Sequence, residues 1–118
     1  MRNNEKRQSR IRQTRELIRK RRLSGLLNNT KWHEVFEWVA SSRIQFDVKL
    51  LSENTLRHCD FIRELESSSI LIDNTGDFIE FFEIESAIFD NNVAKYLDSL
   101  GISYIDNANQ LIVPGYAA

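Results

Sequence analysis

Two short segments of the sequence contain residue types that carry out catalysis in other proteins. HEVFE, from His33 to Glu37, has the first histidine and the glutamate of a zinc-protease helix, but Glu37 stands where the second histidine is required. His58, Cys59 and Asp60 are three catalytic residue types in a row, yet neighbours on a strand point to alternate faces and cannot form a triad. We therefore interpret His33 and Glu37 as solvent-facing helix residues, and Cys59 as a buried, small apolar side chain.

One acidic segment has the beginning of a calcium-binding pattern. Asp73, Thr75 and Asp77 match the first three ligand positions of a calcium loop. That loop requires glycine next, where Phe78 stands, and a bidentate glutamate at its last position, where Ile84 stands. A hairpin turn explains these residues. With two histidines and one cysteine in the chain, we expect no metal and no cofactor.

Two pairs of glutamates, Glu64 with Glu66 and Glu83 with Glu85, are spaced so that each pair lies on one face of a strand. A glycosidase or a nuclease could use such a pair. No lysine follows at nuclease spacing, and the four glycines form no phosphate-binding loop. We expect that the protein is not an enzyme and has no catalytic residues.

The charged residues divide the chain into two parts. Residues 1–27 contain ten Lys/Arg and two Glu, a net charge of +8, whereas residues 28–118 contain six Lys/Arg and fifteen Asp/Glu, a net charge of −9. Such asymmetry indicates a basic segment with its own partner, or one that folds back on the acidic body. We expect a basic helical arm over residues 1–25 and a single acidic α+β domain over residues 26–118.

The arm has three possible roles: binding nucleic acid, binding an acidic protein surface such as its own body, or no dedicated partner. It lacks aromatic residues, so contact with nucleic acid would be to the phosphate backbone. The apolar residues of the arm are few, and we expect any order in it to come from charge. The candidate polyanion-binding residues are Arg12, Arg15, Arg19, Lys20, Arg21 and Arg22.

Periodicity predicts the elements of the first half of the chain. Residues 4–23 contain no Gly or Pro and favour a helix. Residues 30–41 carry apolar residues at helical spacing and predict an amphipathic helix, for which the segment Asn28-Asn29-Thr30 offers an N-cap. Residues 43–51 alternate between apolar and polar and predict a half-buried strand, and a further strand is expected near residues 58–64.

The second half of the chain reads as strands, a helix and a hairpin. Residues 68–72 and 78–84 predict two strands around a turn with Gly76, and the second has bulky apolar residues on both faces, as a central strand does. A helix is expected from residue 91 to Gly101, followed by a hairpin in which Pro114 takes an edge position. The predicted fold is α+β: a small, mostly antiparallel sheet of about four to six strands packed by two amphipathic helices, plus the arm.

Composition and length predict a single soluble domain. The chain has 118 residues, and no stretch is long and apolar enough to cross a membrane. The N-terminus lacks the apolar region of a secretory signal, and one cysteine cannot make an internal disulfide. We expect a cytoplasmic protein with no membrane partner.

Three motifs carry a resemblance to a known family. They are the start LLNNTKWHEVFEWV, the middle segment IEFFEIESAIF and the C-terminal segment GISYIDNANQLIVPGY, which together cover residues 26–116. In these motifs the chain resembles a family of small, uncharacterised bacterial proteins, a domain of unknown function. The resemblance carries no activity, and the basic arm lies outside it.

Small acidic α+β proteins of bacteria without a catalytic site are often immunity proteins, and class analogy suggests the same role here. Such proteins bind a toxin domain and block its active site, and an acidic surface speeds association with a basic cleft. The principal hypothesis is therefore a toxin or effector inhibitor; the alternative is a nucleic-acid-associated accessory protein tethered by its arm. The expected contacts with a protein partner are Trp38, Glu64, Glu66, Asp77, Glu80, Glu83 and Glu85.

Overall fold

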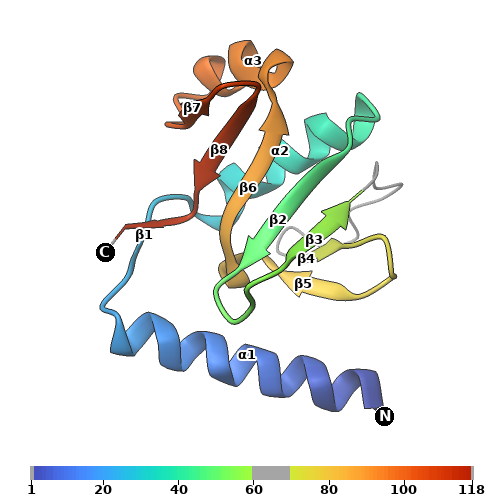
Figure 1. Cartoon of the computed structure of the whole chain (residues 1–118), viewed down its shortest axis with the longest axis vertical. Coiled ribbons are helices and arrows are strands. Elements are labelled where there is room, and N and C mark those ends of the chain that lie inside the picture. The colour runs from blue at the N-terminus through green and yellow to red at the C-terminus, as the bar shows by residue number, and fades with distance from the viewer. Residues whose placement is uncertain (1, 60–69, 118) are drawn as a thin grey trace.

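A computed structural model of the chain describes residues 2–59 and 70–117 (Figure 1). It has an α+β fold, which confirms the predicted fold class. Helices pack against a mainly antiparallel sheet, and a basic helix, α1 (Arg2–Lys20), crosses one end of the molecule.

The central sheet contains, among the described residues, five antiparallel strands in the order β3-β2-β6-β8-β7. They are β2 (Phe46–Leu50), β3 (Leu56–Cys59), β6 (Ile84–Asp90), β7 (Ile105–Asn107) and β8 (Gln110–Pro114). The central position of β6 follows from its pairing with β2 on one side and β8 on the other. The alternation predicted around residues 43–51 is observed in β2, whose residues Phe46, Val48 and Leu50 are buried.

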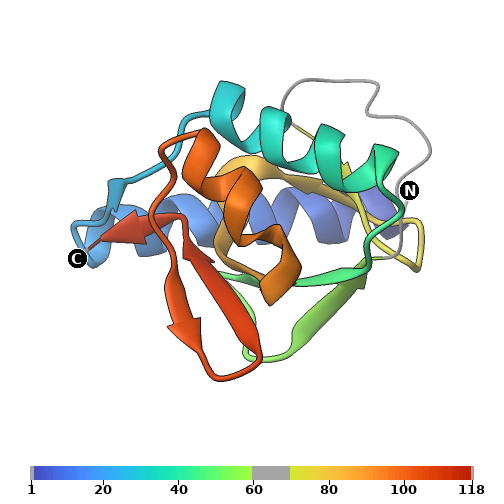
Figure 2. The same ribbon diagram turned by 90° about the horizontal axis from the view of Figure 1, so that it is seen from above.

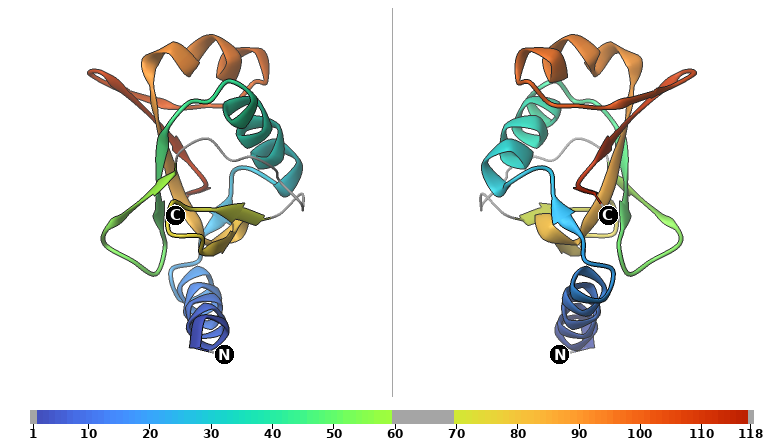
Figure 3. Two further views of the ribbon diagram at one scale, coloured as in Figure 1. Left: turned by 90° about the vertical axis from the view of Figure 1, so that its right-hand side faces the viewer. Right: turned by 90° about the vertical axis from the view of Figure 1, so that its left-hand side faces the viewer.

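Helix α2 (Asn29–Ser41) covers one face of this sheet (Figures 2 and 3). Of the three residues that the sequence offers as its cap, Asn28 is the one that caps it: the Asn28 side chain accepts a hydrogen bond from the Lys31 amide at 2.9 Å. Its apolar stripe is fully buried, and the ring of Phe36 contacts the rings of Phe46 and Phe81. These contacts form the middle of the core.

Helix α3 (Ala94–Ser99) lies beyond the far end of β6. It follows the short 3-10 turn η2 (Asn91–Val93), which Asp90 caps. Gly101 then takes a positive φ of 70° and ends the helix, as predicted.

The strand predicted over residues 78–84 is wrong, because the chain turns in the middle of it. Strand β5 (Phe78–Glu80) ends at the 3-10 turn η1 (Phe81–Glu83), and β6 begins at Ile84. Glu80 and Glu83 cap this turn reciprocally, each side chain accepting from the other residue's backbone amide. The apolar run is buried on all sides because it turns a corner inside the core, and the central strand is the next one along the chain.

Strand β5 pairs with β4 (Ile70–Ile72) in a hairpin, as expected for the turn from Asp73 to Asp77. The Asp73 carboxylate accepts from the amides of Thr75 and Asp77, and Gly76 has a φ of 85°. Residues 58–64 were expected to form a strand. The structure describes only the first part, where β3 ends at Cys59, and the remainder lies outside the described residues, as do residues 68 and 69.

The C-terminal hairpin joins β7 to β8 as predicted. Pro114 pairs with Ser86 on β6, but β7 reaches only as far as Ile112, so Pro114 faces no strand on its other side. The chain then forms β9 (Tyr116–Ala117), which pairs with β1 (Ser24–Gly25). This pairing attaches the segment after α1 to the body of the protein.

Candidate functional site

Helix α1 docks on the body through an arginine that reaches into a group of carboxylates. Arg10 is only 8% exposed. Its Nε donates to Glu83 Oε1 at 2.6 Å, its Nη1 to Asp77 Oδ2 at 3.0 Å, and its Nη2 to the Phe78 carbonyl at 2.6 Å. Glu83 is fully buried, so this ion pair is closed off from solvent on the Glu83 side.

Other residues of α1 on the same face complete the contact. Arg7 Nη2 donates to Glu80 Oε1 at 3.1 Å, and its guanidinium lies 5.6 Å from the centre of the Phe78 ring. Thr14, one turn beyond Arg10, is fully buried and donates its hydroxyl to the Arg10 carbonyl. The contact is therefore ionic at one end of α1 and apolar at the other, where Leu17 and Ile18 are half-buried.

The carboxylates that hold Arg10 also hold a second arginine. Arg57 Nη1 donates to Asp77 at 2.8 Å and to Asp73 at 2.7 Å, while its other nitrogens contact Glu53. Asp77 thus bridges Arg10 and Arg57. The network joins α1, the turn after β2 and the β4-β5 hairpin into one unit.

The pKa values of this network reflect competition between burial and pairing. Burial opposes the charged form of Arg10, but the hydrogen bonds and the attraction from Glu83 prevail and raise its pKa. Burial likewise opposes the charge of Asp73, and the hydrogen bonds from Thr75 and Arg57 outweigh it, so the pKa of Asp73 is lowered. The hydrogen bond from Arg57 lowers the pKa of Glu53. Arg10, Asp73 and Glu53 are therefore charged at neutral pH.

Three of the residues predicted to bind a protein partner belong to the contact with α1. Asp77, Glu80 and Glu83 each bind an arginine of the arm, and Glu83 in particular has no exposed surface to offer a partner. The acidic charge that the sequence offers to an outside protein is here directed at the chain's own N-terminal helix. The sequence signal for this pairing was the opposite charge of the two parts of the chain.

The remaining predicted contacts are spread over the molecule. Glu85 forms an ion pair with Lys49 on the outer face of the sheet. Trp38 is half-buried, and its ring stacks on Tyr96 with the ring centres 4.3 Å apart, which places it at the flank of the core. Glu64 and Glu66 lie outside the described residues.

All six candidate polyanion-binding residues are exposed. Arg12 and Arg19 lie on the side of α1 opposite Arg10, Arg15 lies at the border with the body, and Lys20, Arg21 and Arg22 continue from its last residue into the turn that follows. Arg15 also lies over the Phe82 ring, and Arg19 approaches Glu16 at 3.9 Å. The arm therefore has two sides, one used for docking and one that presents basic residues to solvent.

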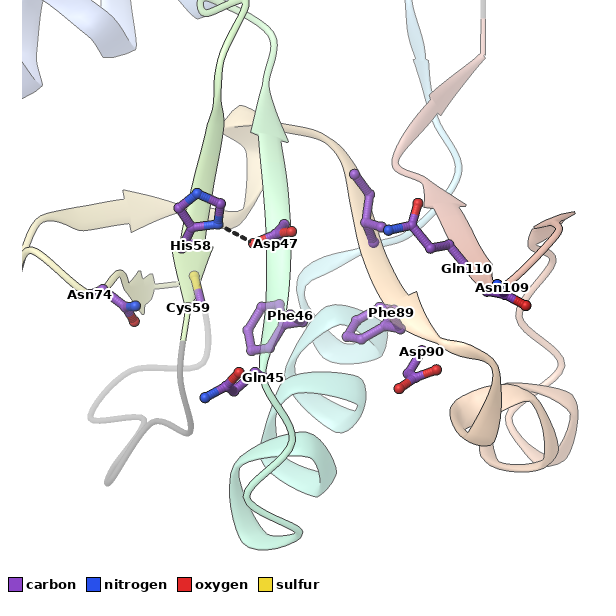
Figure 4. A pocket seen from close by; sticks show the side chains of 11 residues that line it. Gln45, Phe46, Asp47, His58, Cys59, Asn74, Phe89, Asp90, Asn109 and Gln110 are labelled. Carbon is purple, nitrogen blue, oxygen red and sulfur yellow. Dashed lines mark hydrogen bonds and ion pairs between the residues drawn. The ribbon is translucent and has the colours of Figure 1, made fainter.

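The five-stranded sheet has an open face on the side opposite α2. No helix or strand among residues 2–59 and 70–117 covers it (Figures 3 and 4). Strand register defines one row of residues across this face. From β7 to β3 the row consists of Ile105, Ile112, Ile88, Asp47 and His58.

This open face is apolar at one end and polar at the other. Three isoleucines lie side by side on β7, β8 and β6, and Ile105 is 55% exposed. A hollow of about 570 Å³ lies at the end of the sheet where β2 begins and β6 ends, with Ile88, Asp47 and Gln110 among the residues that line it (Figure 4). The sequence analysis did not predict this face. The pattern that could have indicated it is that residues 111–113 are apolar at successive positions, which places apolar side chains on both faces of the sheet.

The polar end of the open face contains a histidine–carboxylate pair, an arrangement that also occurs in catalytic sites. His58 Nδ1 and Asp47 Oδ1 are 2.6 Å apart, and the imidazole is 71% exposed. Cys59, next in sequence, is buried in the core on the other face. Among the described residues, no group of three or more His, Cys, Asp or Glu side chains is arranged to hold a metal ion. The geometry presents a surface for contact, with hydrogen-bonding groups at one end.

The fold and these surfaces define an α+β protein with a self-docked basic helix and an open sheet face. Comparison of the chain with protein-family models, with curated proteins and with solved structures gave no match. In the part of the chain that the structure describes, no helix has the length and apolar character needed to span a membrane.

Proposed function

We propose that this protein is a non-catalytic binding protein of the immunity or inhibitor type, which neutralises a toxin or effector domain by direct contact. The observation that carries the proposal is the open face of the sheet. Antiparallel sheets often leave one face to solvent, but that face is then usually polar. Here it has a row of three isoleucines, and contiguous exposed apolar surface of this kind marks binding sites.

The surroundings of the isoleucines suit a basic partner. Asp47, Glu85 and Asp90 are on or beside the open face, and Lys49, two residues after Asp47 on β2, is paired with Glu85. An apolar centre with a polar and acidic rim is the usual construction of a protein interface. Its charge would draw in a partner with a basic cleft, such as the active site of a nuclease toxin.

The proposed contact surface differs from the one expected from sequence. Glu85 remains part of it, whereas Asp77, Glu80 and Glu83 are engaged by α1. We assign the main anchoring role to Ile88, Ile112 and Ile105, at the apolar end of the face, because a few well-packed anchor residues contribute most of the energy of binding at an interface.

The test uses the toxin or effector domain encoded beside the gene as the partner. The protein and this domain are produced together in a bacterial host, and growth and binding by calorimetry are measured. We expect Ile88→Arg/Ile112→Arg to abolish protection and to weaken binding at least about 30-fold, the effect of removing an interface hot spot. Leu26→Arg is the matched control, because Leu26 is an apolar residue 53% exposed outside the open face.

Thermal unfolding of both variants shows whether they fold. If the folded double variant protects as well as the unchanged protein, the open face is not the binding surface. If no toxin domain is encoded nearby and the protein captures no protein partner from its host, the inhibitor function itself is rejected.

A further inference from the structure

We propose that the outward side of α1 is a second binding surface, which takes the phosphate backbone of nucleic acid without sequence preference. It is separate from the open sheet face and does not depend on the inhibitor function. The surface consists of Arg12, Arg15, Arg19, Lys20, Arg21 and Arg22.

The docking of α1 fixes which of its residues face solvent. Arg10 has three partners on the body and Thr14 is fully buried, so the helix cannot rotate about its axis without breaking the buried pair with Glu83. Arg12 and Arg19 lie on the opposite side of the helix from these two residues. Docking therefore holds the outward basic residues of α1 in a fixed orientation on the surface of the protein. We call this surface the basic ridge.

The ridge keeps its charge after the chain has folded. The described part of the chain gives Arg12, Lys20, Arg21 and Arg22 no ion pair, and Arg19 has only a long contact to the exposed Glu16. The carboxylates near α1 are directed instead at Arg7, Arg10 and Arg57. Folding therefore neutralises the inward arginines and leaves the outward ones available to an anion.

The distribution of acidic residues on the rest of the molecule favours approach of a polyanion from the side of α1. The exposed carboxylates Asp90, Asp98 and Asp106 belong to the end formed by α3 and β7, whereas α1 forms the other end of the longest axis, which is 39 Å (Figure 1). Because the screening length in about 0.1 M salt is about 10 Å, a polyanion bound at α1 would feel little repulsion from that acidic end.

The chemistry of the ridge selects nucleic acid among polyanions. A helix that binds a membrane surface must offer an apolar face to the lipid, but Ile11, Leu17 and Ile18 of α1 are turned toward the body. The exposed residues of α1 are mainly arginine, lysine, glutamine and serine, with two glutamates, Glu5 and Glu16, and no aromatic residue, so bases would not stack on it. Arginines along one side of a helix suit successive phosphates.

The experiment measures binding of the full-length protein to a fluorescent random-sequence DNA duplex and to the matching RNA duplex, from about 50 to about 200 mM salt. We expect binding that is independent of sequence and falls steeply with salt. Arg12→Gln/Arg19→Gln should weaken it about tenfold or more at the lowest salt and make the plot of log affinity against log salt shallower by about two.

The matched control is Arg43→Gln/Lys95→Gln, which removes the same charge from exposed residues outside α1. Circular dichroism confirms that each variant is folded. The proposal is overturned if neither duplex binds at the lowest salt, if both double variants weaken binding equally, or if the protein binds vesicles containing phosphatidylserine but neither duplex. Retention of toxin neutralisation by Arg12→Gln/Arg19→Gln would show that the two surfaces act separately.

Discussion

At the scale of single residues, Glu83 has two tasks at once. Its carboxylate accepts the Glu80 amide at 2.8 Å, which caps η1, and it accepts two hydrogen bonds from Arg10. A buried carboxylate requires such partners, because desolvation of an unpaired charge costs several kcal/mol. The attachment of α1 and the turn that begins the central strand β6 therefore depend on the same side chain.

Substitution of Arg10 by Met should lower the free energy of unfolding by about 3 kcal/mol, because Glu83 is left buried without its cation. Arg10→Met/Glu83→Gln should recover a large part of this loss, since glutamine keeps the cap on η1 but is uncharged. The free energy of unfolding in urea is measured for the unchanged protein, these two variants and Glu83→Gln, which together form a double-mutant cycle. A loss below about 1 kcal/mol for Arg10→Met would show that the pair contributes little and that α1 is held by other contacts.

Asp73 links the stability of the protein to pH. Its pKa in the folded protein is lowered, so its contribution is fully present above the pKa of the unfolded chain and is lost as pH falls through the folded value. We expect the free energy of unfolding to fall below about pH 4, and Asp73→Asn to be less stable at neutral pH with a flatter decline in acid. Denaturant titrations across this range measure both. If the free energy of unfolding declined equally with falling pH in the two proteins, Asp73 would not be the group that links stability to pH.

At the scale of elements, the connection between the C-terminal strands depends on one close backbone approach. A Cβ on Gly115 would lie 2.6 Å from the carbonyl oxygen of Ile84 and 3.1 Å from the ring of Trp32. The Gly115 amide also donates to the Glu85 carbonyl at 2.8 Å, so the strand cannot move away freely. Only glycine fits where β8 leads into β9 against the start of β6.

Gly115→Ala should therefore lower the free energy of unfolding by about 1–3 kcal/mol, the usual cost of overpacking. Gly25→Ala is the control, because its nearest neighbour to an added Cβ, a Tyr116 ring atom, is 4.0 Å away. Thermal unfolding compares the two. If both substitutions had the same small effect, the backbone at residue 115 would be able to shift, and the close approach would not constrain the fold.

At the scale of the whole molecule, some basic residues of the arm form ion pairs with the acidic body, and the others remain exposed. Arg7 and Arg10 bind carboxylates of the body, and the remaining basic residues of α1 face outward at one end. The open sheet face is on a different side from the ridge on α1 (Figure 1). The two proposed surfaces are thus separate, and the experiments above examine each with substitutions that leave the other unchanged.

The sequence alone was sufficient where structure follows from local pattern. The amphipathic spacing in residues 30–41 corresponds to α2, the alternation in residues 43–51 to the shorter strand β2, and the turn that begins at Asp73 and the helix end at Gly101 occur as predicted. In each case the signal lies within a few residues, because one side of the element is apolar or one backbone angle requires glycine. The α+β class followed from the order of such elements.

The tertiary structure decided everything that depends on residues far apart in the chain. Arg10 and Glu83 are 73 positions apart, so no local pattern distinguishes Arg10 from the exposed arginines beside it. The turn within residues 78–84 brings Glu83 to Arg10 of α1, and the apolar part of the open face arises because β6, β8 and β7 align their isoleucines. The amino-acid composition determined that arm and body carry opposite charge. Packing determined which charged residues pair, because the cost of desolvation allows a charged side chain to be buried only when it has a partner.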